Sequence, residues 1–109
     1  MPINLLGKFY FKKTTNGNLL GEFSNNIDNI ILTESADLDQ DDSESYLGDY
    51  NSTWQQNGKP CFANLKISQK PGIRNKIFIL NWKVKGGILI FKGEGMLCDN
   101  ILIGDYQKV

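Results

Sequence analysis

The sequence predicts an all-β protein, a single small antiparallel up-and-down (meander) β-barrel of about eight strands. The chain has 109 residues, which suits one domain with one core, residues 1–109. Its 12 Ile against 2 Ala, with 11 Gly and 11% aromatic residues, favours strands over helices. Turn dipeptides recur along the chain and leave only short connections, which make sequential strands antiparallel neighbours. Closing such a meander into a barrel removes its two exposed edges, so we expect a barrel rather than a sandwich.

The first hairpin is the most clearly marked element. Residues 8–15 alternate aromatic and polar side chains, Asn16-Gly17 is a strong two-residue turn signal, and residues 18–24 return as the second strand. Residues 30–33 predict a short third strand. Residues 34–45 are then predicted to be a long acidic loop, with room for at most one short helical turn.

The remaining strands follow in order, separated by turn pairs such as Asn57-Gly58 and Gly86-Gly87. They are expected at residues 45–54, 60–69, 75–84, 88–93 continuing at 96–98, and 101–107.

A short pattern, apolar-Gly-acid-aromatic, occurs three times. Its copies are Leu20-Gly21-Glu22-Phe23, Leu47-Gly48-Asp49-Tyr50 and Ile103-Gly104-Asp105-Tyr106. In a strand the glycine and the aromatic residue share one face, and the acid lies on the other. We expect the glycines to serve close packing and bending of the barrel, and the alternative is that the three acids bind a ligand.

Two of these segments carry a family resemblance. Residues 16–25 and 45–52 resemble early strands of the avidin and streptavidin barrels, and residues 93–106 resemble the closing strands of lipocalin-like bacterial domains. The resemblance implies a calycin-like barrel with a pocket. It does not imply biotin, because avidins place several Trp on their later strands and this chain has only Trp54 and Trp82.

The composition bears on catalysis and on location. There is no His, which removes the usual general base and the Ser-His and Cys-His pairs. Two cysteines, Cys61 and Cys98, cannot complete a zinc site, and we expect partly buried reduced thiols. We therefore expect no enzyme, no cofactor and no metal. No signal peptide pattern and no apolar run of about 18 residues is present, which predicts a cytoplasmic protein without a membrane span.

The net charge is zero, but the charges are unevenly distributed along the chain. Residues 34–49 hold acids and no bases, whereas residues 50–93 hold bases and no acids. Solvated surface is the plainest interpretation. Weak cation binding is a second one, although Asp37-x-Asp39-x-Asp41 does not continue as an EF-hand loop. An anionic ligand or nucleic acid on residues 59–92 is a third, disfavoured by the neutral charge and by the single Arg.

The leading hypothesis is a non-enzymatic protein that binds a small, largely apolar ligand inside the barrel. The expected wall residues lie on inward strand faces, with Asn81 as the polar contact: Phe23, Tyr50, Trp54, Trp82 and Tyr106. The alternative is a protein-protein interaction module, of inhibitor or immunity type, that acts through its outer face or its acidic loop. A cavity of about 300 Å³ or more would favour the first, and a filled barrel with exposed apolar side chains would favour the second.

A homo-oligomer is also expected. The strand at residues 75–84 is apolar on both faces, and only one face can enter the barrel. The other face, with residues 88–91 beside it, is predicted to lie in a symmetric interface.

Overall fold

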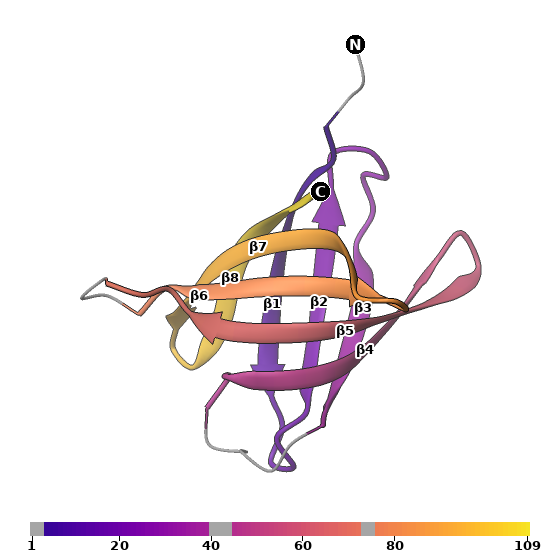
Figure 1. Ribbon diagram of the computed structural model, residues 1–109. Helices are drawn as coiled ribbons and strands as arrows, with labels where there is room; N and C mark the ends of the chain where they lie inside the picture. Colours follow the sequence, from indigo (N-terminus) through magenta and orange to yellow (C-terminus); the bar gives the residue numbers. More distant parts are fainter. Residues whose placement is uncertain (1–3, 40–44, 73–75) are drawn as a thin grey trace.

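The computed structural model describes residues 4–39, 45–72 and 76–109, which form eight antiparallel strands closed into one barrel (Figure 1). Each strand pairs with the next, and the last pairs with the first. The strands are β1 (Leu6–Lys13), β2 (Leu19–Asn25), β3 (Leu32–Leu38), β4 (Gly48–Gln56), β5 (Lys59–Gln69), β6 (Phe78–Val84), β7 (Ile88–Cys98) and β8 (Ile101–Lys108). The predicted up-and-down barrel is confirmed. Over these described ranges, no helix is long and apolar enough to cross a membrane.

The third strand is longer than predicted, and the acidic loop is correspondingly shorter. β3 continues to Leu38 because its side chains alternate, with Glu34 and Ala36 buried and Ser35 and Asp37 exposed. This alternation gives the segment a core face, which a solvated loop lacks. The residues described within the predicted loop contain no helical turn, and its positions 40–44 lie outside the described residues.

The seventh strand runs without a break through Gly93 and Gly95, where an interruption was predicted. A Cβ at Gly93 would lie 2.3 Å from the carbonyl oxygen of Asp105 on β8. The glycines thus allow the two strands to approach closely instead of ending the strand.

The repeated motif faces as predicted, but its glycines differ in role. Gly21 and Gly104 are crowded, since a Cβ would lie 1.9 Å from the Tyr10 carbonyl oxygen and 2.0 Å from that of Glu94, respectively. Gly48 is not crowded, because its nearest contact would be Leu38 at 3.5 Å. Its backbone has a φ of +145°, so the constraint at this position is conformational.

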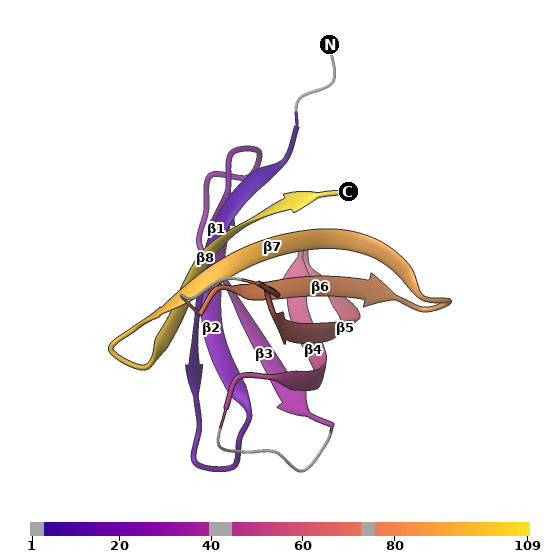
Figure 2. The same ribbon diagram turned by 60° about the vertical axis from the view of Figure 1, so that its left-hand side comes forward.

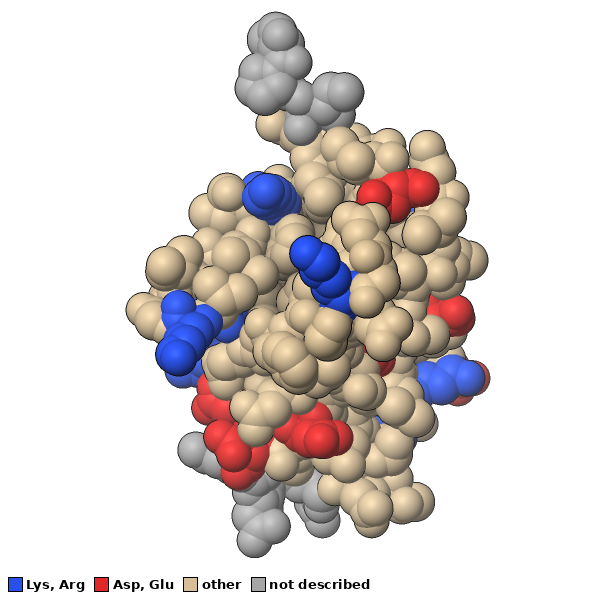
Figure 3. Space-filling model, turned by 90° about the vertical axis from the view of Figure 1, so that its right-hand side faces the viewer, with Lys and Arg blue, Asp and Glu red and all other residues tan. Residues whose placement is uncertain are grey.

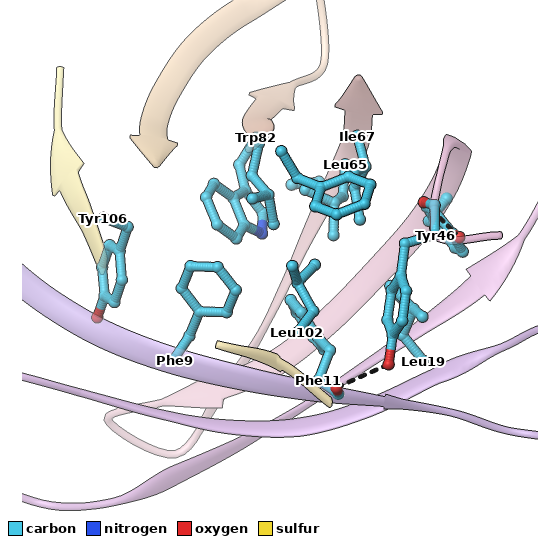
Figure 4. Packing of buried hydrophobic residues seen from close by; sticks show 14 of the residues in the cluster. Phe9, Phe11, Leu19, Tyr46, Leu65, Ile67, Trp82, Leu102 and Tyr106 are labelled. Atoms are coloured by element: carbon cyan, nitrogen blue, oxygen red, sulfur yellow. Dashed lines mark hydrogen bonds between the residues drawn. The ribbon is translucent and has the colours of Figure 1, made fainter. Parts of the chain in front are cut away.

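The barrel has two different ends. The odd-numbered strands begin at one end, which we call the mouth, and both chain termini lie there (Figures 1 and 2). At the far end the ring of Tyr46 packs against Phe78, with ring centroids 6.4 Å apart. Its hydroxyl donates to the carbonyl oxygen of Phe11 at 3.0 Å, which Figure 4 shows, and lies 2.8 Å from the carbonyl oxygen of Asn100. This tyrosine closes the far end.

Between the two ends the interior is packed with side chains. Fully buried side chains come from β1 to β6 and from β8. They include Phe11, Leu19, Ala36, Tyr50, Leu65, Leu80 and Leu102. On β6, Phe78, Leu80 and Trp82 point inward, while Ile77, just before the strand, and Ile79 are half-buried on the outside.

The outer surface mixes the two charge types that the sequence separates. Asp49 of the acidic segment pairs in register with Lys66 of the basic segment, and Lys70 forms an ion pair with Glu94 at 3.1 Å. Both signs of charge occur on the face shown in Figure 3, and most of that face is uncharged. Cys61 and Cys98 are free thiols, and Cys98 is exposed rather than partly buried.

Candidate ligand-binding site at the barrel mouth

A small pocket lies inside the barrel toward the mouth. It has a volume of about 30 Å³ and is lined by residues of seven strands and of the segment before β1. The lining residues are Leu5, Phe9, Phe23, Asn25, Glu34, Trp54, Gln56, Trp82, Phe91 and Tyr106. Between this pocket and the far end, the interior is filled by the buried side chains described above.

Six aromatic rings form most of the pocket wall. The Tyr106 ring packs against those of Phe91, Trp82 and Phe23, at centroid distances of 5.7, 6.0 and 6.1 Å. The ring centroids of Phe9 and Trp82 lie 5.9 Å apart. Figure 4 shows both rings near Tyr106. Three of these four pairs meet edge to face, which is an arrangement that aromatic side chains prefer, and the Trp82–Tyr106 pair is tilted at 57°.

A glycine sets the position of the Tyr106 ring. Gly7 of β1 lies opposite Tyr106 in the sheet, and a Cβ there would lie 2.2 Å from two atoms of the ring. The ring can therefore lie across the backbone of β1. Its hydroxyl donates to the carbonyl oxygen of Ser24 at 3.3 Å.

A carboxyl group lies within this aromatic wall. Glu34 is 6% exposed and sits on β3 between Gly21 and Trp54 of the neighbouring strands. The indole N–H of Trp82 donates to its Oε2 at 2.8 Å, and the hydroxyl of Ser52 donates to the same oxygen. Within the described residues, no hydrogen bond ends on the other oxygen, Oε1.

Burial raises the pKa of Glu34 to about 7, although the hydrogen bonds from Ser52 and Trp82 act in the opposite direction. Desolvation disfavours a carboxylate more strongly than two donors to one oxygen can offset. The carboxyl therefore changes its charge near neutral pH.

A polar network forms part of the rim. Asp28, in the turn after β2, accepts hydrogen bonds from the side-chain amides of Asn25 at 3.2 Å and Gln56 at 3.1 Å. The Asn25 amide also lies 3.5 Å from the Tyr106 hydroxyl. Burial raises the pKa of Tyr106, and the nearby Glu34 and Asp28 carboxylates raise it further.

Four of the six residues predicted from the sequence line this pocket: Phe23, Trp54, Trp82 and Tyr106. Tyr50 is inward-facing but lies toward the far end, where its hydroxyl donates to the Tyr46 carbonyl oxygen at 2.8 Å. Asn81 was predicted wrongly as the polar contact. It alternates with Leu80 and Trp82 and therefore faces outward, in register between Lys66 and Lys92.

The sequence interpretation missed the polar residue that does enter the pocket. Glu34 was counted with the acidic loop, and its period-two spacing with the inward-facing Ala36 was the available signal. Phe9, Phe91 and Asn25 were also missed as wall residues.

The fold and the site together define a closed eight-stranded antiparallel barrel with an aromatic pocket that contains a buried carboxyl. This architecture is compatible with a calycin-like fold. No protein-family model, curated protein or solved structure matches the chain.

Proposed function

We propose that this chain is a non-enzymatic, cytoplasmic binding protein of calycin type, which binds a small, largely apolar ligand at the mouth of its barrel. The observation that supports the proposal is the Glu34 carboxyl, buried among six aromatic rings with one oxygen that receives no hydrogen bond within the described residues. This oxygen is not fully shielded from the surface, because no fully buried side-chain oxygen of the described residues lacks a partner. It can therefore accept a hydrogen bond from a group that enters the pocket. Aromatic walls with a few polar groups are the usual composition of small-molecule sites.

The size of the pocket limits what can enter it. A volume of about 30 Å³ holds about two water-sized groups, far below the roughly 300 Å³ of an enclosed site for a whole ligand. The interior does not therefore have room for a complete ligand. By the criterion set from the sequence, so small a volume counts against a ligand enclosed in the barrel and favours the interaction module. The ligand proposal is therefore limited to partial entry: a polar head group contacts Glu34, and the apolar body packs against the half-buried Leu5 and Phe91 at the mouth.

Intrinsic fluorescence offers a direct test, because the chain has two tryptophans and both line the pocket. The purified full chain is titrated with 2-phenylethylamine, 2-phenylethanol and phenylacetate, which share a phenyl body and differ in the head group. We expect at least one of them to change the tryptophan emission saturably. Native mass spectrometry of the same preparation reports any ligand that co-purifies.

Phe91→Ala should weaken this binding, since it removes a wall of the pocket. Phe62→Ala is the matched control, because Phe62 is 67% exposed on the outer surface. If no probe binds, or if both variants weaken binding equally, the proposed site is wrong.

A second candidate, a protein-protein contact, is favoured by exposed apolar side chains outside the barrel. Met96 and Ile103 pair across β7 and β8 and are 63% and 44% exposed. Lys8 on β1 and Asp105 on β8 pair in register beside them, so both signs of charge border the same surface. In a symmetric pair of chains, positive charge on one copy can face negative charge on the other. We therefore propose that a second copy of this chain binds to this surface. Sedimentation equilibrium tests this proposal, and a monomer that binds a different protein through this surface would contradict it.

A further inference from the structure

The pocket at the mouth has a one-sided charge distribution. Among the described residues, Glu34 is the one that lines the pocket with a charged form near neutral pH, and no described Lys or Arg lines it. Asp28 lies at the rim, where its carboxylate is held by Asn25 and Gln56. Both groups are acidic, so their ionised forms favour a positively charged group in the pocket.

The aromatic wall adds to this preference. The faces of aromatic rings carry partial negative charge and attract cations, most strongly where water is excluded. Six such rings line the pocket together with Glu34, and the ring centroids of Trp82 and Tyr106 lie 6.0 Å apart. A carboxylate and ring faces together form a site for positive charge, whereas an anionic head group would meet repulsion from both.

When Glu34 is ionised, the protein stabilises its buried negative charge only in part. Ser52 and Trp82 both donate to Oε2, and both are neutral groups. Burial raises the pKa of Glu34 to about 7, which shows that these two donors do not offset desolvation. A neutral ligand would leave the ionised carboxylate without a counter-charge, whereas a cation would neutralise it.

We propose that the head group bound at the mouth is a protonated primary amine, whose ammonium donates to Glu34 Oε1 within the aromatic wall. This inference rests on the proposed ligand-binding function and assigns the chemical class of the ligand. The pocket of about 30 Å³ accommodates an ammonium with its neighbouring methylene and is too small for a bulky quaternary head. A primary ammonium can in addition donate the hydrogen bond that Oε1 is able to accept.

The experiment compares probes of one shape that differ in charge. The full chain at pH 8, where Glu34 is ionised, is titrated with 2-phenylethylamine, 2-phenylethanol, phenylacetate and benzyltrimethylammonium. Tryptophan emission gives the affinity, and the indole N–H resonance of Trp82 in a ¹H–¹⁵N spectrum reports on the bond to Glu34. We expect the primary amine to bind at least about tenfold more tightly than the alcohol, the range of a charge-assisted hydrogen bond.

Two variants locate the charge effect. Glu34→Gln should bring the amine-to-alcohol ratio close to one while the alcohol still binds. Asp37→Asn should leave the ratio unchanged, because Asp37 lies on the same strand but is exposed on its outer side. The ratio of amine to alcohol affinity is measured on the wild-type protein alone. It therefore tests the proposal even if Glu34→Gln does not fold.

The outcomes separate this inference from the proposed function. If the alcohol or phenylacetate binds as tightly as the amine, the cation proposal is overturned and the binding function remains. Tighter binding of the quaternary probe than of the primary amine would overturn the hydrogen bond to Oε1. If none of the probes binds, the binding function fails and the inference fails with it.

Discussion

Replacing Glu34 by Gln should make the protein more stable at alkaline pH and leave its stability nearly unchanged at acid pH. The folded state raises the pKa of this carboxyl from 4.5 to about 7. Between these two values the folded protein holds a proton that the unfolded chain has lost. The wild-type protein is therefore destabilised progressively as the pH rises through this window, and the loss is complete above pH 7.

The size of the effect follows from the pKa shift. One pKa unit corresponds to 1.36 kcal/mol, so the shift of Glu34 corresponds to roughly 3 kcal/mol. Glutamine has the same shape, can accept the hydrogen bonds from Ser52 and Trp82 through its amide oxygen, and carries no charge. Near pH 4.5 the two proteins should thus differ little, and above pH 7 the variant should be more stable by about 3 kcal/mol at most.

Urea denaturation followed by far-UV circular dichroism at pH 4.5, 6 and 8 measures this difference. Asp37→Asn is the control, because it removes a carboxyl from the exposed side of the same strand. The reasoning is refuted if Glu34→Gln and wild type respond to pH in parallel, or if the control shows the same rise in relative stability.

Two further predictions concern the packing of the barrel and its outer surface. Gly21→Val should lower the free energy of unfolding by on the order of 1–3 kcal/mol, because the new Cβ would lie 1.9 Å from a backbone oxygen. Glu22→Gln, on the outer side of the strand, should lower it by only a few tenths of a kcal/mol. Equal urea midpoints of the two variants would contradict the packing role of the motif glycine. If copies of the chain associate, Ile103→Lys should shift sedimentation equilibrium toward 12.3 kDa. Ile79→Lys should have little effect, because Ile79 is half-buried and pairs in register with the polar Ser68 and Glu94. This differs from the interface on residues 75–84 that the sequence led us to expect. A monomeric wild type at micromolar concentration, or the reverse order of the two variants, would exclude the β7–β8 surface.

The fold was predictable because its signals are local. Asn57-Gly58 marks a hairpin, and both residues have positive φ angles in the structure, 54° and 75°. Short turns of this kind determine which strands are neighbours, and closure follows from the need to remove the edges. The predicted end of the third strand was wrong, because the acidic composition of residues 34–38 favours a loop although their side chains alternate as in a strand.

The site was predictable only in part, because strand alternation gives the face of a residue but not its height along the barrel. Tyr50 and Trp54 share the inner face of β4, yet one lies toward the far end and the other lines the pocket. Height depends on the register between strands, such as the pairing of Glu34 with Trp54, which no local pattern reveals. The outward position of Asn81, in contrast, could have been inferred from the large apolar residues on both sides of it.

The polar groups inside the barrel differ between its two ends, and this difference indicates where a ligand would bind. At the far end the Tyr46 and Tyr50 hydroxyls both reach carbonyl oxygens, at 2.8–3.0 Å. The Lys13 ammonium donates to the Tyr50 hydroxyl at 3.0 Å and lies 5.3 Å from the centre of that ring. Internal cation, rings and acceptors thus satisfy one another there.

The mouth also contains aromatic rings and a hydrogen-bond acceptor, but its described lining residues include no cation. Glu34 and the aromatic residues that line the pocket with it enclose a small volume, and none of the described lining residues is Lys or Arg. The far end shows that this fold can hold an ammonium against tyrosine rings with its own residues. Since the described lining of the mouth lacks such a residue but keeps the carboxylate and the rings, an ammonium supplied by a ligand would complete the arrangement, which is the reason to test amines first.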